Sequence, residues 1–294
     1  MLAIILNTAS GTASKPETAA RVTELFEAAG VPTRLHVLSS PEALRALVER
    51  ELAAGADAVV AGGGDGTVNT IASILAGGPT PLGVLPLGTL NHFAKVFQIP
   101  MDLDKAVGII AKGHVARVDV GRVNDRVFVN NCSIGIYPNI VERRERLRAE
   151  GIGKWPAFFR AVLEVLRREE EVSVRLDVDG RQIVSRTPFV FVGNNEYQVE
   201  GIHLGARSQL DAGRLFAYLA PRVHTRDLPK LLTHALLGRA RQDGQLQVVP
   251  AVELWIETLY AREIKVACDG ELLKLKTPLH FRSWPRALGV MVSP

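Results

Sequence analysis

The stretch that decides the fold is AVVAGGGDGTVNTIAS, residues 58–73. An apolar run typical of a buried strand ends in three glycines, and a helical pattern follows Asp65-Gly66-Thr67. This order of strand, glycine turn and helix places backbone N–H groups and the positive end of the helix dipole against any ligand bound there. Because glycine lets the backbone approach a phosphate closely, the turn predicts a phosphate site.

The carboxylate of Asp65 distinguishes this turn from the common phosphate loops. A dinucleotide fingerprint needs a third glycine where Thr67 stands, and a Walker loop needs a lysine that this turn lacks. A carboxylate repels phosphate unless a metal ion bridges the two or the carboxylate handles a proton, and both are demands of phosphoryl transfer. The alternative, that Asp65 only caps the helix, stays open at this point.

Strand and helix patterns alternate over the first part of the chain, which predicts a parallel α/β sheet. Strands are expected at residues 2–7, 33–39, 57–63 and 82–86, and helices at 15–30, 40–55, 67–78 and 101–113.

Two more of these strands end in polar loops, NTASGTAS at residues 7–14 and PLGTLN at residues 86–91. Ligands of parallel α/β sheets bind outside the carboxyl ends of the strands, so three strand ends are expected to converge on one nucleotide. The candidate nucleotide-binding residues are Asn7, Ser10, Gly11, Gly63, Gly64, Gly66, Thr67, Gly88, Thr89 and Asn91.

The pattern changes near residue 116 to short β segments separated by turns such as Asp179-Gly180, which predicts a largely antiparallel domain. Helical stretches at about 138–170 and 226–238 interrupt these segments. We predict an α/β nucleotide-binding domain over residues 1–117 and a β-rich domain over residues 118–285. The final segment, 286–294, is a strand that can return to the first domain.

Composition limits the classes of function. The chain has 294 residues, of which 47% are hydrophobic and 22% charged, and its net charge of +4 is too small to imply a nucleic-acid partner. Two cysteines, Cys132 and Cys268, make neither a disulfide framework nor a zinc site. The N-terminus is typical of a first strand rather than a signal peptide, and no apolar run has membrane-spanning length. We therefore expect a cytoplasmic protein whose membrane contact is peripheral, at the inner face.

Three motifs together resemble the diacylglycerol kinase catalytic family, which includes bacterial lipid kinases, sphingosine kinases and ceramide kinases. They are Gly-Gly-Asp-Gly-Thr at 63–67, Pro-x-Gly-Thr-x-Asn at 86–91 and Asp-Gly-Glu at 269–271. The resemblance covers nearly the whole chain and implies an NAD kinase-like fold. That fold has a Rossmann-like parallel α/β domain and an antiparallel β-sandwich domain with a helical insertion, which together enclose a cleft for ATP and Mg²⁺.

The resemblance also implies roles for five acids in transferring the γ-phosphate of ATP to a hydroxyl of a lipid such as diacylglycerol or a sphingoid lipid. Asp269 is expected to be the general base on the lipid hydroxyl, with Glu271 near the metal and Asp65 organising metal and phosphate. In some eukaryotic relatives the base is the acid that matches Asp65, so both assignments are kept. Asp119 and Asp211 match positions associated with metal ions.

The sequence departs from the family pattern at three places. Asn7 is followed by threonine rather than proline, His92 stands where an aspartate is common, and Tyr137 replaces an acid that precedes the lipid pocket. The last change leaves the preferred lipid headgroup open.

Residues 142–168 hold eight Lys or Arg and four Glu around Trp155 and two phenylalanines, a composition that suits a membrane surface. The alternative is a solvated helix pair whose aromatic residues pack on the β domain. We expect Tyr137 and Trp155 to contact the lipid substrate, and a peripheral membrane surface to be a partner. Relatives often form dimers, so a homodimer is also considered.

Two other functions are weighed against a lipid kinase. An NAD kinase or other small-polyol kinase shares the first motif but lacks the second, which favours lipid. A non-catalytic lipid or nucleotide binder on the same scaffold needs none of the acids Asp65, Asp269 and Glu271, so their presence favours catalysis. His92 and Tyr137 keep the binder open.

Overall fold

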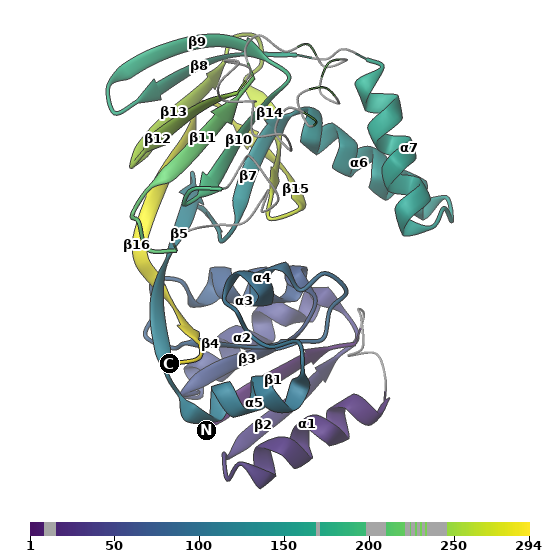
Figure 1. Cartoon of the computed structure of the whole chain (residues 1–294), viewed down its shortest axis with the longest axis vertical. Coiled ribbons are helices and arrows are strands. Elements are labelled where there is room, and N and C mark those ends of the chain that lie inside the picture. The colour runs from purple at the N-terminus through teal and green to yellow at the C-terminus, as the bar shows by residue number, and fades with distance from the viewer. Residues whose placement is uncertain are drawn as a thin grey trace. The chain divides into compact units, whose positions relative to one another are not determined.

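The structure is a computed structural model that describes residues 1–8, 16–168, 171–197, 210–220 and 246–294, together with residues 224, 227, 230 and 233. Ser10, Gly11 and most of the helix expected at 226–238 lie outside the described residues. The chain forms two compact units (Figure 1). Unit 1 comprises Met1–Val118 and Arg286–Pro294, and unit 2 comprises Asp119–Pro285.

Unit 1 contains a parallel sheet in the order β2-β1-β3-β4, and the end of β16 pairs in parallel with β4. The strands are β1 (Leu2–Asn7), β2 (Thr33–Leu38), β3 (Ala58–Gly63), β4 (Leu82–Pro86) and β16 (Leu279–Met291). β1, β3 and β4 are buried along their whole length, as expected for parallel strands covered on both faces. The prediction of a parallel α/β sheet is therefore confirmed.

The helices of unit 1 cover both faces of this sheet, because α1 packs against α5 and α2 packs against α3 (Figure 1). They are α1 (Pro16–Ala28), α2 (Leu44–Ala53), α3 (Asp65–Leu75), α4 (His92–Val96) and α5 (Leu103–Lys112). A 3₁₀ turn, Pro41–Ala43, leads into α2. α3 begins at Asp65, two residues earlier than predicted. An acid in the first turn interacts favourably with the helix dipole.

The strand order reverses between β1 and β3, and the glycine turn that follows β3 lies beside this border. β1 has β2 on one side and β3 on the other, so the connection from β1 to β2 and the connection from β3 to β4 run in opposite directions from the β1–β3 border. The carboxyl ends of β1, β3 and β4 are Asn7, Gly63 and Pro86, and register pairs Gly63 with Pro86. Ligands of open α/β sheets bind at such a point.

Unit 2 is built from two antiparallel sheets. One has the order β12-β11-β10-β7-β14-β15. The other has the order β16-β13-β8-β9, and β5 pairs with both β16 and β6. The strands are β5 (Val115–Val123), β6 (Arg126–Phe128), β7 (Asn131–Gly135), β8 (Val172–Val178), β9 (Arg181–Thr187), β10 (Phe189–Asn194), β11 (Leu215–Leu219), β12 (Gln247–Ala251), β13 (Glu253–Thr258), β14 (Glu263–Cys268) and β15 (Glu271–Lys276).

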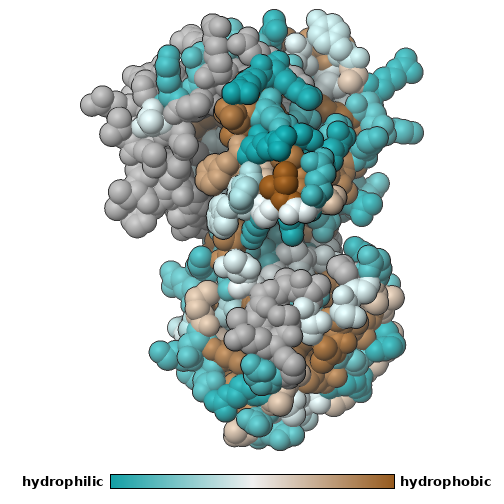
Figure 2. Space-filling view, turned by 90° about the vertical axis from the view of Figure 1, so that its right-hand side faces the viewer, coloured by the Kyte–Doolittle hydropathy of each residue, from teal (hydrophilic) through white to brown (hydrophobic). Residues whose placement is uncertain are grey.

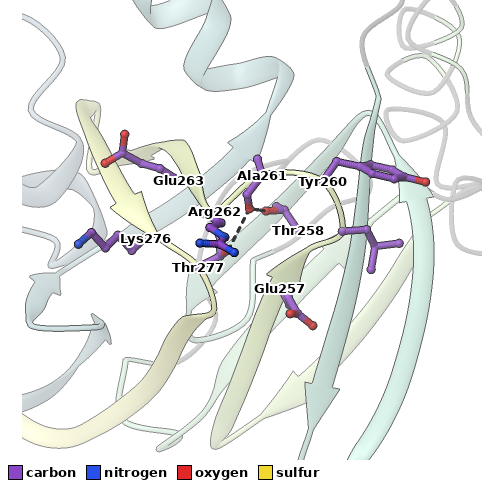
Figure 3. Close-up of a pocket in the computed structure, with 9 residues that line it drawn as sticks. Glu257, Thr258, Tyr260, Ala261, Arg262, Glu263, Lys276 and Thr277 are labelled. Carbon is purple, nitrogen blue, oxygen red and sulfur yellow. Dashed lines mark hydrogen bonds between the residues drawn. The ribbon is translucent and has the colours of Figure 1, made fainter.

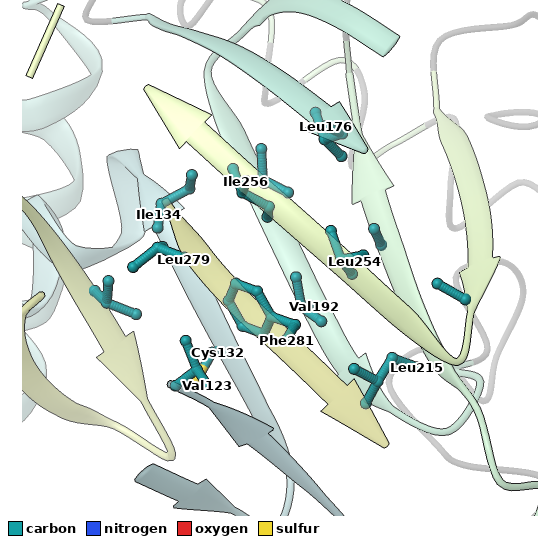
Figure 4. Packing of buried hydrophobic residues seen from close by; sticks show 14 of the residues in the cluster. Val123, Cys132, Ile134, Leu176, Val192, Leu215, Leu254, Ile256, Leu279 and Phe281 are labelled. Carbon is teal, nitrogen blue, oxygen red and sulfur yellow. The ribbon is translucent and has the colours of Figure 1, made fainter. Parts of the chain in front are cut away.

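The core of unit 2 lies between these sheets, and both contribute apolar side chains to one buried cluster (Figure 4). Val192 and Leu215 come from one sheet, and Leu254 and Phe281 come from the other. The hairpin predicted at Asp179-Gly180 is present between β8 and β9. The expected antiparallel β-sandwich is confirmed.

The two cysteines form a disulfide, which the sequence interpretation did not anticipate. Cys132 on β7 and Cys268 on β14 are direct partners in the antiparallel register, with their Cα atoms 4.1 Å apart. They are separated by 136 residues in the chain. Only the pairing of β7 with β14 brings them together, so sequence spacing carries no signal for this bond.

The helical insertion is a pair, α6 (Ile136–Ala149) and α7 (Lys154–Leu166), which pack against each other. Their contact is centred on Leu147 of α6 and on Ala157 and Ala161 of α7. In the described part of the chain, no helix is both long enough and apolar enough to cross a membrane.

Candidate functional site

The glycine turn of unit 1 is tied to the first strand by a buried hydrogen bond. The side-chain amide of Asn7, the last residue of β1, donates to the hydroxyl of Thr67 in the first turn of α3 over 2.9 Å. Gly63 lies directly beside this threonine, and a Cβ atom there would come 3.0 Å from the Thr67 hydroxyl oxygen. The ends of β1 and β3 are therefore held in one arrangement.

The turn after β4 lies in direct contact with the glycine turn. A Cβ atom on Gly88 would come 2.4 Å from the Cα atom of Gly64, so only glycine fits there. Asn91, with φ at 50°, shapes this second turn from within. Its side-chain oxygen accepts from the Gly88 N–H over 2.8 Å, and its amide donates to the carbonyls of Pro86 and Gly88 over 3.0 Å.

Asp65 joins the two turns. Its Oδ1 atom accepts a hydrogen bond of 3.0 Å from the backbone N–H of Phe93, in the first turn of α4. The carboxylate therefore lies between the N-terminal ends of α3 and α4. Gly66 and Thr89, the remaining predicted residues that the structure describes here, are exposed on this surface.

This arrangement suits a polyphosphate. The first N–H groups of α3 have no acceptor within the helix, and no neighbouring atom lies within 4 Å of the space that a Cβ atom on Gly66 would occupy. The described residues contain no group of three or more His, Cys, Asp or Glu that could hold a metal ion. The carboxylate of Asp65 lies beside the glycine turns, and Mg²⁺ commonly binds to one or two carboxylates together with phosphate oxygens.

In unit 2, the predicted base Asp269 is held firmly by backbone amides. It occupies the tight turn between β14 and β15, with φ at 49°, which confirms the hairpin expected there. Its Oδ2 atom accepts from the Val129 N–H over 2.7 Å, and its Oδ1 atom accepts from the N–H groups of Asn130 and Asn131 over 2.8 and 3.1 Å. We call this arrangement the Asp269 clasp. Glu271, two residues further on, is exposed at the start of β15.

Buried asparagines support the clasp, and the sequence analysis did not identify them. The Asn194 amide donates to the Asp119 and Val129 carbonyls over 2.8 and 2.9 Å, and the Asn194 N–H donates to the Asn130 carbonyl over 2.9 Å. Asn195 is fully buried beside them in the chain. Two Asn-Asn pairs at strand ends, residues 130–131 and 194–195, were the sequence signal that could have located this network.

Asp119 and Asp211 belong to the same part of unit 2. The Asp119 N–H donates to the carbonyl of Leu210 over 2.9 Å, and its Oδ2 atom accepts from the Gly213 N–H over 2.6 Å. Asp119 is buried whereas Asp211 is exposed on the loop that Asp119 anchors. Their role as metal ligands stays a prediction.

The two residues expected at the lipid substrate lie on the helical insertion. Tyr137 is in the first turn of α6 with 39% of its surface exposed, and Trp155 is in the first turn of α7 with 59% exposed. Trp155 forms an aromatic group with Phe158 and Phe159, with ring centroids 5.7–6.5 Å apart.

Ion pairs lock α6 to α7 and to the sheet. Arg143 of α6 and Arg160 of α7 bind the carboxylate of Glu164, and these hydrogen bonds lower the pKa of Glu164 to about 2. Lys265 on β14 binds Glu142 over 2.8 Å, which lowers the pKa of that carboxyl. A polar pocket of about 340 Å³ lies among these residues and contains no predicted site residue.

A larger polar hollow of unit 2, of about 830 Å³, lies at the opposite end of the β14–β15 hairpin from Asp269 (Figure 3). Its floor is a turn in which the Thr258 and Thr277 hydroxyls both donate to the Ala261 carbonyl. None of the predicted site residues lines it.

Comparison with protein families matches both parts of the chain. Residues 1–123 match the diacylglycerol kinase catalytic domain, and residues 138–292 match the YegS C-terminal NAD kinase beta sandwich-like domain. A diacylglycerol kinase of Staphylococcus saprophyticus is 24% identical over 270 residues, covering 91% of this chain and 88% of that protein. A diacylglycerol kinase of Staphylococcus aureus strain bovine RF122 is 27% identical over 244 residues, covering 82% and 76%.

A solved structure shares the fold. The crystal structure of a diacylglycerol kinase from Bacillus anthracis strain Sterne superimposes with a TM-score of 0.73 at 21% identity, covering 100% of this chain and 97% of that one. Family models together match most of the chain, and the motifs at residues 63–67, 86–91 and 269–271 lie within them. The chain belongs to the diacylglycerol kinase catalytic-domain family.

Proposed function

We propose that the protein is a lipid kinase that transfers the γ-phosphate of ATP to a hydroxyl of a lipid, with diacylglycerol as the first candidate. The observation that carries the proposal is the contact between two glycine turns with Asp65 between them. This contact presents helix N–H groups and one carboxylate to the same ligand, as a phosphoryl donor requires. The relatives' name supplies the substrate class.

On the nucleotide side, we assign the binding of phosphates to the first turn of α3. Thr67 cannot rotate freely because Asn7 holds its hydroxyl, and Gly88 keeps the second turn close enough to cover the same ligand. Asp65 is oriented by the Phe93 N–H and would be the residue that helps to hold Mg²⁺. The ion, when bound, neutralises charge on the transferred group.

On the acceptor side, we assign Asp269 as the general base and Glu271 as an acid near the metal. Three amides fix the plane of the Asp269 carboxylate, so the group is already oriented when a lipid hydroxyl is aligned with it. A base of this kind commonly contributes about 10²–10⁴-fold to the rate. The alternative base, Asp65, and the cleft that would bring both acids together stay predictions.

The test is a transfer assay with ATP labelled on its γ-phosphate, Mg²⁺ and a panel of acceptors: diacylglycerol, a sphingoid base, ceramide and NAD. We expect a labelled lipid, and a loss of at least about a hundredfold in kcat for Asp65→Asn or Asp269→Asn, because each removes a carboxylate from the proposed chemistry. Asp125→Asn, a change of the same kind in the exposed β5–β6 turn, should leave kcat unchanged.

The outcomes separate the candidate functions. Label on NAD alone would assign the chain to the small-polyol alternative. Binding of ATP without label on any acceptor would favour a non-catalytic binder. If both variants kept full activity, the assigned chemistry would be refuted.

A further inference from the structure

The helix α7 carries three of its large apolar side chains on the outside. Trp155, Phe159 and Leu163 are four residues apart and therefore share one face of the helix, where they are 59%, 65% and 50% exposed. The face that packs against α6 holds the small residues Ala157 and Ala161, which are fully buried.

This distribution is the reverse of an ordinary surface helix, which buries its large apolar residues and exposes polar ones. Seen from the side that carries α6 and α7, unit 2 shows brown apolar surface among hydrophilic side chains (Figure 2). We call Trp155, Phe159 and Leu163 the α7 apolar face. Among the residues of unit 2 that the structure describes, no packing contact explains why these three side chains are large.

Basic side chains lie at both ends of the α7 apolar face. Lys154 in the first turn of α7 and Arg167 at its C-terminal cap are exposed, whereas the single acid of α7, Glu164, is bound by Arg143 and Arg160. Lys154 and Arg167 form no ion pair with any residue that the structure describes. The surface is therefore apolar at its centre and basic at its margins.

We propose that the α7 apolar face docks on the surface of an anionic phospholipid bilayer, with α7 lying parallel to the membrane plane. Tryptophan and phenylalanine favour the boundary between headgroups and acyl chains. Long Lys and Arg side chains can lie along this boundary and place their charges among anionic headgroups.

The same charges argue against a second copy of the chain as the occupant. A symmetric dimer would place the α7 apolar face against itself, and the basic margins would then oppose one another. An anionic bilayer offers both the apolar layer and the negative charge. The inference rests on the proposed function, because docking would bring the protein to a lipid substrate.

The experiment is flotation of the whole protein with vesicles, without ATP, so that binding is measured apart from catalysis. We expect binding to vesicles of phosphatidylcholine with phosphatidylglycerol and little binding to phosphatidylcholine alone. The double variant Phe159→Ala, Leu163→Ala should bind at least about tenfold more weakly, since two half-exposed side chains can no longer be buried in lipid. Tyr260→Ala, which removes an 89% exposed aromatic from the β13–β14 turn, is the matched control and should bind normally.

Trp155 provides an independent readout. Lipids brominated on their acyl chains should quench tryptophan fluorescence of the wild type, and Trp155→Phe should lose this quenching. Lys154→Glu with Arg167→Glu should weaken binding to the anionic vesicles, whereas Arg45→Glu on α2 should not.

Three results would overturn the proposal: equal binding by the double variant and the wild type, equal loss in Tyr260→Ala, or light scattering that shows the double variant dissociating a dimer. Activity on a short-chain, water-soluble diacylglycerol measures the proposed function separately. Vesicle binding without that activity would refute the kinase and leave the docking face standing.

Discussion

The Asp269 clasp makes a quantitative prediction for Asp269→Asn. An asparagine keeps one carboxamide oxygen, which can serve the Asn130 and Asn131 amides, but its NH₂ group then faces the Val129 N–H. Val129 is 1% exposed and Asn130 is 5% exposed, so water cannot readily replace the lost acceptor. The loss of the charged acceptor at the buried Val129 N–H should cost about 1–3 kcal/mol, and two charge-assisted bonds become neutral, at about 1 kcal/mol each.

The expected cost is therefore about 3–5 kcal/mol of unfolding free energy for unit 2. Chemical denaturation followed by tryptophan fluorescence reports on this unit, because Trp155, Trp255 and Trp284 all lie within it. Hydrogen exchange at the amides of residues 129–131 should also become faster, since these N–H groups lose their charged acceptor.

Asp179→Asn is the matched control. Asp179 also occupies the first position of an Asp-Gly hairpin, with φ at 48°, but no hydrogen bond of its carboxylate is present among the described residues. We expect that substitution to cost under about 0.5 kcal/mol. If Asp269→Asn were equally mild, the three amide bonds would not be holding the turn, and the argument for a pre-oriented base would fail.

Two further predictions concern unit 1 and the helical insertion. Gly88→Ala should abolish binding of a fluorescent ATP analogue, because the new Cβ atom would meet the Gly64 backbone at 2.4 Å and force the turns apart. Below the unfolded-state pKa of a glutamate, about 4.3, Glu164 should lose its stabilising pairing with Arg143 as the pH falls toward its folded pKa of about 2. Acid unfolding followed by exchange of the α6–α7 amides measures this loss.

Each has a control. Gly108→Ala, in α5, meets no atom within 4 Å and should leave analogue binding intact; equal weakening by both variants would contradict the contact argument. Glu164→Gln should already be destabilised at neutral pH and show a flatter response between pH 4 and 2. Stability should fall with falling pH because the ion pair of Glu164 is fully present above the unfolded-state pKa and is lost as the pH falls through the folded-state pKa.

Local pattern was sufficient for much of the fold. Apolar runs of strand length, helical spacing and Asp-Gly turns predicted the parallel sheet, the antiparallel domain and the hairpins at residues 179–180 and 269–270. These features depend on neighbouring residues only, since period and turn chemistry are local properties of the backbone. The resemblance then supplied roles for the motif acids.

The sequence pattern did not predict contacts between residues that are far apart in the chain. Cys132 and Cys268 are partners only because β7 and β14 pair, and the Asp269 carboxylate meets amides some 140 residues away in the chain. Helical spacing left open whether the aromatic residues of α7 are exposed or packed, because it shows that large and small residues occupy opposite faces without showing which face packs against α6.

The sequence by itself determined where strands, hairpin turns and the glycine turns lie, because each of these follows from the chemistry of a few consecutive residues. The tertiary structure alone decided that Gly88 must be glycine, that Asp269 is held by three amides, and that Trp155 faces outward. Those facts depend on which segments become neighbours when the chain buries its apolar surface, and that choice is made by the whole chain at once.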